Sequence, residues 1–268
     1  MKALRLFALP LLLTLLSCGA IDQPRLYTKV LFVGNSLTYV GNVPAVYSAL
    51  AQANGHDSPS DMIVRAGATL SQRVGDGSVA RALEEGSYTH LVVQERGGDL
   101  MCSFGAGSCT QAREAVLALA DVGRRNGAVV LLLGTYQSDP SASRQLIESE
   151  SEAARNAGIP YIEVSGRLQR LRGTAPELSW FFAADDFHPG RDLALLNALL
   201  VYHAIHGELP QPGPLTVKAP IYGSTSGLDE TLRNSDAPPP LETTPIEVRY
   251  DSAVVEKLLD SLVAPSGD

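Results

Sequence analysis

A serine and a histidine in two distant segments of the chain could act as a nucleophile and its base. Ser36 lies in Gly-Asn-Ser-Leu-Thr, residues 34–38, and His188 ends Asp-Asp-Phe-His, residues 185–188. A serine hydroxyl is a weak nucleophile until a base removes its proton, and a histidine held by a carboxylate can do this near neutral pH. Asp185 supplies that carboxylate, while Asp186 receives no role. These residue types predict acyl transfer.

The elements around these residues would place them at one edge of a sheet. Ser36 follows the apolar run Lys-Val-Leu-Phe-Val, residues 29–33, so it should lie just past the carboxyl end of a first buried strand. Open α/β sheets bind their ligands at that edge. A serine in this place is also a common helix N-cap, which is the alternative interpretation of Ser36.

Short apolar strands and amphipathic helices alternate along the rest of this region, which indicates an α/β fold with a central parallel sheet. The strands are expected at 31–33, 63–65, 91–94, 129–134 and 161–164. The helices are expected at 44–54, 79–85, 111–126, 143–157 and 191–206. We expect a catalytic domain over residues 29–206.

The composition changes after residue 206. The segment 207–268 holds 9 of the 17 prolines, and proline lacks a backbone donor, so we expect mostly irregular structure that wraps around the domain. Helical periodicity returns at residues 250–263.

The order of these motifs resembles the SGNH, or GDSL-like, hydrolase superfamily, over residues 29 to about 206. The resemblance implies a flavodoxin-like three-layer sandwich and a triad of Ser36, His188 and Asp185. It implies that the glycine after the second strand, Gly67, donates its N–H to the oxyanion. An ordinary turn glycine is the alternative for Gly67.

The third motif of the family departs from its usual form, because Gly-x-Asn-Asp is missing after the third strand. The strand runs into Gln94, Glu95 and Arg96 instead. Gln94 carries the same carboxamide as asparagine and could serve as an oxyanion donor. Alternatively, Glu95 and Arg96 form a salt-bridged rim.

The first residues read as a targeting segment. Lys2 and Arg5 precede an apolar stretch too short to span a bilayer, and Leu-Leu-Ser-Cys-Gly at 15–19 resembles a bacterial lipobox. We therefore expect a signal peptide at 1–17, lipid on Cys18 and a tether at 18–28. The protein would be anchored in the cell envelope, at the outer membrane or in the periplasm of a two-membrane bacterium. An ordinary secretory signal is the alternative.

The other two cysteines, Cys102 and Cys109, form an even pair in a protein expected to be exported, which predicts a disulfide. No metal site and no other cofactor are expected, since His203 and His206 lack further ligands and His56 and His90 have no partner motif.

The charge excludes a nucleic-acid partner: the formal charge of −8 becomes −10 when Lys2 and Arg5 are removed. The expected function is a serine esterase acting on short acyl esters, such as O-acetyl groups on a glycan. The alternatives are a lipase or lysophospholipase, or a lipid-anchored glycan-binding module without activity. Trp180 could line a substrate pocket, or belong to the core beneath the histidine loop.

Overall fold

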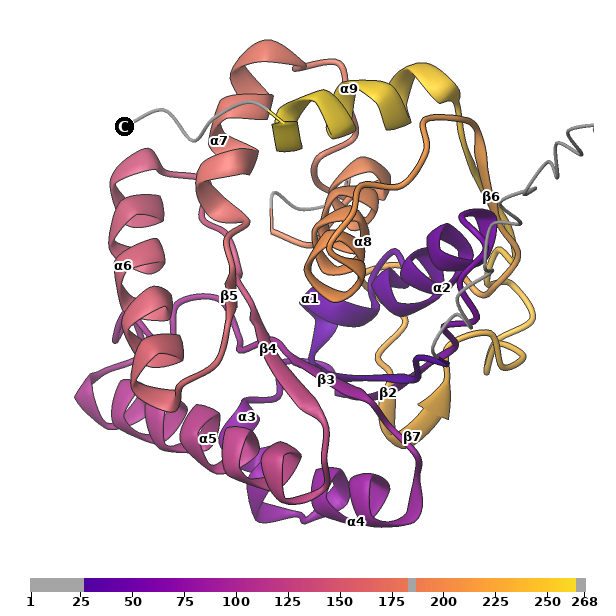
Figure 1. Cartoon of the computed structure of the whole chain (residues 1–268). Coiled ribbons are helices and arrows are strands. Elements are labelled where there is room, and N and C mark those ends of the chain that lie inside the picture. The colour runs from indigo at the N-terminus through magenta and orange to yellow at the C-terminus, as the bar shows by residue number, and fades with distance from the viewer. Residues whose placement is uncertain (1–26, 183–186, 264–268) are drawn as a thin grey trace, which may run out of the picture.

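The computed structural model describes residues 27–182 and 187–263, and within them a six-stranded sheet forms the centre of the protein (Figure 1). The strand order is β5-β4-β3-β1-β2-β7. The strands are β1 (Val30–Gly34), β2 (Ser60–Arg65), β3 (His90–Val93), β4 (Val129–Leu133), β5 (Tyr161–Ile162) and β7 (Asp229–Asn234). Strands β1 to β5 pair in parallel, which confirms the predicted α/β class.

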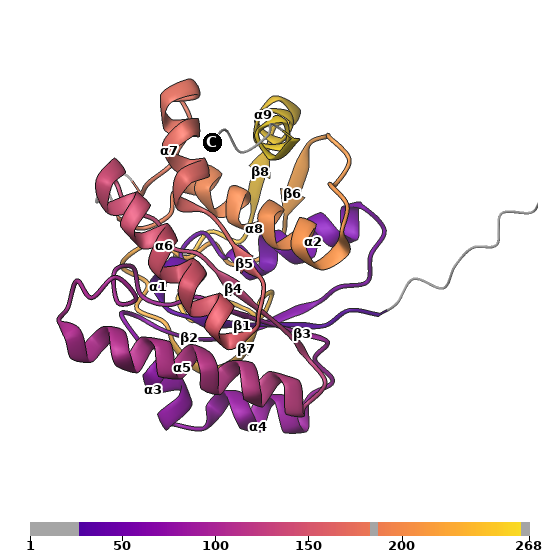
Figure 2. The same cartoon turned by 60° about the vertical axis from the view of Figure 1, so that its left-hand side comes forward.

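Helices cover both faces of the sheet, as the continuous apolar strands require. On one face, Val30 and Phe32 join the core beneath α2 (Val43–Ala53) and α8 (Arg191–His206). On the other, Leu31 and Val33 join a second core that includes residues of α4 (Ser78–Glu85) and α5 (Ala106–Arg125). Figure 2 shows the sheet between these two layers. The three-layer sandwich is confirmed.

Three short or weakly patterned helices were not predicted. They are α1 (Ser36–Tyr39), α3 (Leu70–Gly75) and α7 (Ser165–Thr174). Helices of one or two turns give little periodic signal, and tertiary packing rather than propensity stabilises them. The longer α6 (Pro140–Ala157) was expected from residue 143 and begins one turn earlier, with Asp139 as its N-cap.

The C-terminal segment contributes more regular structure than the prolines suggested. Strand β7 pairs antiparallel with β2 and forms an edge of the central sheet. Two further strands, β6 (Leu215–Val217) and β8 (Val248–Tyr250), pair with each other, and α9 (Ser252–Val263) follows. The expected irregular structure was wrong at residues 229–234, because a polar edge strand gives no apolar pattern. The expected terminal helix is confirmed.

Cys18, Asp185 and Asp186 lie outside the described residues, so what the sequence predicts for them stays a prediction. Within the described ranges, no helix combines the length and the apolar character needed to cross a bilayer.

Candidate active site

The carboxyl ends of the central strands define the edge at which the candidate residues meet. In the parallel register, Gly34 of β1 stands beside Val64 of β2, and Val33 stands beside Val93 of β3. The loops that follow these three strands therefore start at one level. These loops carry Ser36, Gly67 and Gln94.

Ser36 is the first residue of α1 rather than its cap. Asn35 is the N-cap, and its Oδ1 accepts a hydrogen bond of 3.0 Å from Leu37 N. The alternative in which the Ser36 hydroxyl caps the helix is therefore wrong. Ser36 is buried, with 7% of the residue exposed.

Asn35 has a second bond, which ties the nucleophile segment to the next loop. Its Nδ2 donates to Ala68 O at 3.1 Å. The side chain is buried, and its two ends hold α1 and the loop after β2 in a fixed relation. The bond requires the amide of asparagine, since the aspartate of the name-giving family motif has no such donor.

Gly67 stands in that loop with a left-handed backbone, at φ of 66°. A side chain there would meet no atom within 4 Å, so the conformation rather than crowding favours glycine. The residue is exposed. The turn and the oxyanion interpretations are therefore compatible with each other.

Gln94 is buried and has a partner at each end of its amide. Its Oε1 accepts from Thr38 Oγ1 at 2.8 Å, and its Nε2 donates to Gly134 O at 3.1 Å. This places Gln94 between α1 and the end of β4. An amide nitrogen carries two hydrogens, and the bond to Gly134 uses one. Thr38 fits beside Gly34 because a Cβ on Gly34 would stand 2.2 Å from Thr38 Oγ1.

Glu95 is buried, and its carboxylate forms no ion pair with the guanidinium of Arg96. The predicted salt-bridged rim of these two residues is therefore wrong. Arg96 instead makes two hydrogen bonds to Asp99, at 2.8 and 3.0 Å. The Glu95 carboxylate accepts from Leu70 N and from Arg96 N. Burial raises the pKa of Glu95 to about 7, against the lowering effect of these hydrogen bonds. A charged side chain directly after a strand gave no sequence signal that it would point inward.

His188 lies in the loop that leads into α8. Its backbone carbonyl accepts from Phe182 N at 2.9 Å, and Tyr136 Oη donates to the neighbouring Phe187 O at 3.1 Å. Tyr136 follows β4, so this loop is attached to the same edge of the sheet. The backbone at residue 190 lies close to the carbonyl of Ser179, and a Cβ at this position would stand 2.3 Å from Ser179 O, so only glycine fits there.

The Ser36 and His188 segments converge at Gly97. A methyl group at Gly97 would lie 3.6 Å from Leu37 Cδ1 and 3.9 Å from Phe187 Cε2. Leu37 adjoins Ser36, and Phe187 adjoins His188. Side chains that adjoin the predicted nucleophile and base therefore lie near the same glycine, while the contact between Ser36 and His188 stays a prediction.

Trp180 belongs to the core, in agreement with the second interpretation of it. It is 5% exposed, it is part of the α2–α8 core, and its Nε1 donates to Ala175 O at 3.0 Å.

Two of the remaining histidines, His56 and His206, lie together near the amino end of β2. His56 and His206 stack with ring centres 4.1 Å apart, and His56 Nε2 lies 2.8 Å from Glu208 Oε1. Burial and the neighbouring His56 lower the pKa of His206 to about 4. No group of metal-binding side chains occurs among the described residues.

A second buried carboxylate lies at the end of β4. Glu150 of α6 accepts from Thr135 N at 2.9 Å, from Thr135 Oγ1 at 2.7 Å and from Tyr161 Oη at 2.8 Å. Burial raises its pKa to about 7. These three donors fully explain the position of the side chain.

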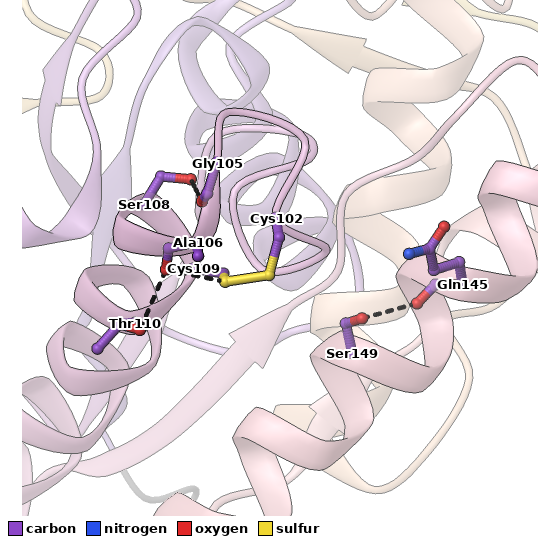
Figure 3. Close-up of a disulfide and its surroundings, with 8 residues drawn as sticks. All are labelled: Cys102, Gly105, Ala106, Ser108, Cys109, Thr110, Gln145 and Ser149. Carbon is purple, nitrogen blue, oxygen red and sulfur yellow. Dashed lines mark hydrogen bonds between the residues drawn. A yellow bond between two sulfur atoms is a disulfide. The ribbon is translucent and has the colours of Figure 1, made fainter.

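The predicted disulfide between Cys102 and Cys109 is confirmed (Figure 3). It attaches the segment after Arg96 to the first turn of α5, which begins at Ala106. The Arg96 guanidinium lies 4.1 Å from the ring centre of Phe104, inside the loop that the disulfide closes. The covalent bond and this contact both restrain the loop beside Glu95.

Two cavities lie in different parts of the protein. One of about 260 Å³ adjoins the Gly67 loop and is lined by Thr69, Ser71, Gln72, Arg96, Asp99, Ser108, Gln111 and Ala112. A larger one of about 670 Å³ includes Ser58, Pro59 and Ser60 at the amino end of β2, away from the candidate catalytic residues. Thr69, two residues after Gly67, is among the residues that line the smaller cavity.

No family model and no curated protein matches the chain. The solved structures that resemble it include the following three. A DUF4886 family protein from Bacteroides uniformis is 14% identical with a TM-score of 0.59, over 90% of this chain and 96% of that one. The psychrotrophic esterase EstA from Pseudoalteromonas sp. is 17% identical with a TM-score of 0.50, over 67% and 97%. A catalytic mutant of Axe2, an acetylxylan esterase from Geobacillus stearothermophilus, is 12% identical with a TM-score of 0.50, over 69% and 95%.

At such identities the likeness concerns the fold. The similar structures cover between 67% and 90% of this chain. The chain therefore has the fold of the SGNH hydrolases, as its sequence resemblance implied.

Proposed function

We propose that the protein is a serine esterase that hydrolyses short acyl esters, with Ser36 as nucleophile, His188 as base and Asp185 as the group that orients His188. The observation that carries this proposal is the convergence of the Ser36 and His188 segments at Gly97, at the edge of the sheet that also bears the Gly67 loop.

In the proposed reaction, His188 takes the proton of the Ser36 hydroxyl while Oγ bonds to the carbonyl carbon of the ester. The N–H groups of Ser36 and Gly67 stabilise the oxyanion, and the second amide hydrogen of Gln94 is a third candidate donor. His188 returns the proton to the leaving alcohol, which departs and leaves an acyl-serine. A water molecule then gives a proton to His188 and attacks the acyl carbon. The bond between this carbon and Ser36 Oγ breaks, Oγ takes the proton back from His188, and the acid is released.

The proposed substrate is an O-acetylated glycan. The cavity beside the Gly67 loop is lined mainly by hydroxyl, amide and charged side chains, which suit the many hydroxyl groups of a sugar better than a hydrocarbon chain. A similar structure belongs to an acetylxylan esterase, which supports an acetylated glycan as the first substrate to try. Lipid on Cys18 would place this activity in the cell envelope.

The test is hydrolysis of 4-nitrophenyl acetate, 4-nitrophenyl octanoate and acetylated xylan by the purified protein, Ser36→Ala and His188→Ala. We expect turnover of the acetyl substrates by the parent protein, and at least a thousandfold loss in both variants. Preference for the octanoate would indicate a lipid esterase. Binding of acetylated xylan without any turnover by the parent protein would indicate a glycan-binding module and overturn the proposal.

A further inference from the structure

The Glu95 carboxylate lies in the protein interior directly after β3. Glu95 is 1% exposed. Its Oε1 accepts from Arg96 N at 2.8 Å, and Leu70 N lies 3.1 Å from Oε1 and 3.3 Å from Oε2. Burying a carboxylate is costly unless hydrogen bonds compensate for the lost water. We therefore expect the buried carboxylate of Glu95 to have a role that an apolar side chain could not perform.

The bond to Leu70 connects Glu95 to the Gly67 loop. Leu70 is the first residue of α3, three positions after Gly67. On its other side the same loop is held by Asn35, whose Nδ2 donates to Ala68 O at 3.1 Å. The short segment 66–70 is therefore attached at Ala68 to the residue before Ser36, and at Leu70 to the end of β3.

We propose that Glu95 is a positioning residue that holds the Gly67 N–H in place for the oxyanion. This inference rests on the proposed esterase function. Glu95 acts through the backbone of the loop and does not touch the substrate. Displacement of an oxyanion donor weakens a bond that forms mainly in the transition state, so loss of Glu95 should lower kcat far more than it changes KM.

The role depends on the charge of Glu95, since an ionised acceptor makes the stronger hydrogen bond. Burial and Asp99 raise the pKa of Glu95, while its hydrogen bonds and Arg96 lower it. On the facing helix α3, Arg73 forms an ion pair with Asp76. Full activity should thus need the ionised form of Glu95.

The chain offers a matched control in Glu150. This carboxylate is equally buried, accepts from both backbone and side-chain donors, and has its pKa raised by burial in the same way. Its partners are Thr135 and Tyr161, so it is not attached to the Gly67 loop. Glu150→Gln removes a buried charge without releasing that loop.

The experiment measures kcat and KM for 4-nitrophenyl acetate from pH 5 to 9 with the parent protein, Glu95→Gln, Glu95→Ala and Glu150→Gln. We expect kcat at pH 8 to fall about tenfold in Glu95→Gln and about a hundredfold in Glu95→Ala, with KM within about threefold of the parent value. On the acid side, log kcat/KM should fall by about one unit more in the parent protein and in Glu150→Gln than in Glu95→Gln. Thermal unfolding checks that each variant is folded.

Hydrogen–deuterium exchange over residues 66–72 gives a readout independent of turnover, and we expect at least tenfold faster exchange in Glu95→Gln than in Glu150→Gln. An active Glu95→Gln with unchanged kcat and the acid-side fall of the parent protein would overturn the inference and leave the esterase function standing. Unchanged hydrogen exchange over residues 66–72 in Glu95→Gln would also overturn the inference and leave the esterase function standing. A parent protein without esterase activity would overturn the proposed function together with this inference.

Discussion

Replacement of Asn35 by serine tests the connection between the nucleophile segment and the Gly67 loop. A serine at the N-cap can still accept from the first turn of α1, but it is too short to keep the bond from Asn35 Nδ2 to Ala68 O. Asn35→Ala removes both bonds. The two variants therefore separate the cap from the connection.

The expected losses follow from the burial of the site. Asn35 is 1% exposed, so loss of the donor leaves the Ala68 carbonyl without this partner, at a cost of about 1–3 kcal/mol in the free energy of unfolding. Loss of the cap adds about 1 kcal/mol in Asn35→Ala. A loss of about 2 kcal/mol lowers the Tm by roughly 4–8 °C for a protein of this size.

Urea unfolding and kinetics with 4-nitrophenyl acetate are the assays, with Asn42→Ser as the control. Asn42 is also a buried N-cap, and it accepts from Ala45 N while donating to Pro220 O and Ser235 O. It holds the C-terminal segment rather than the Gly67 loop. Asn42→Ser should lose as much stability as Asn35→Ser, yet keep kcat within about twofold, whereas Asn35→Ser should lose about tenfold in kcat.

The reasoning would be refuted by an Asn35→Ser variant with the stability and the kcat of the parent protein. It would also be refuted if Asn42→Ser lowered kcat as strongly as Asn35→Ser, because general destabilisation would then explain both.

Four further predictions concern other parts of the molecule. The pKa of Glu150 is raised from its ordinary 4.5 to about 7, so the folded state holds this proton more tightly and the free energy of unfolding should fall as the pH rises through that window. In urea unfolding, Glu150→Gln should make the decrease in the free energy of unfolding between pH 4.5 and 8 smaller by about 3 kcal/mol. An unchanged pH dependence would argue against this prediction. Replacing Cys102 and Cys109 together by alanine should cost roughly 2 kcal/mol, given a sequence separation of 7, and an unchanged Tm would contradict this. Gln94→Ala should lower the free energy of unfolding by about 1–3 kcal/mol, because the bonds to Thr38 and Gly134 are lost. The same variant should lower kcat more than it changes KM. Full retention of kcat would remove Gln94 from the oxyanion donors. Cys18→Ala should move the protein from the membrane to the soluble fraction of a bacterial host, and unchanged partitioning would rule out lipid on Cys18.

The sequence could predict the parallel sheet and its covering helices because these elements follow simple apolar periods. Residues 191–206 were predicted as a helix to the residue, and β1 within one residue at each end. Strand β7 was not predicted, because an exposed edge strand needs no alternation of apolar and polar residues. Its sequence, Asp-Glu-Thr-Leu-Arg-Asn, shows little such alternation.

The candidate site was predictable in its residue types and less so in its connections. The positions of Ser36, Gly67 and His188 follow from the order of motifs along the chain. The inward direction of Glu95 does not, because only the folded chain brings Leu70 N to the end of β3. The bond from Asn35 Nδ2 to Ala68 O depends in the same way on a loop 33 residues away.

Covalent labelling with a fluorophosphonate measures most directly whether Ser36 is an activated nucleophile. Such reagents bond to a serine oxygen only when a base has activated it. We expect the mass of one phosphonyl group on the peptide that contains Ser36 in the parent protein, no adduct in Ser36→Ala, and at least a hundredfold slower labelling in His188→Ala. A parent protein that stays unlabelled, or a label on another residue that persists in Ser36→Ala, would contradict the proposed mechanism.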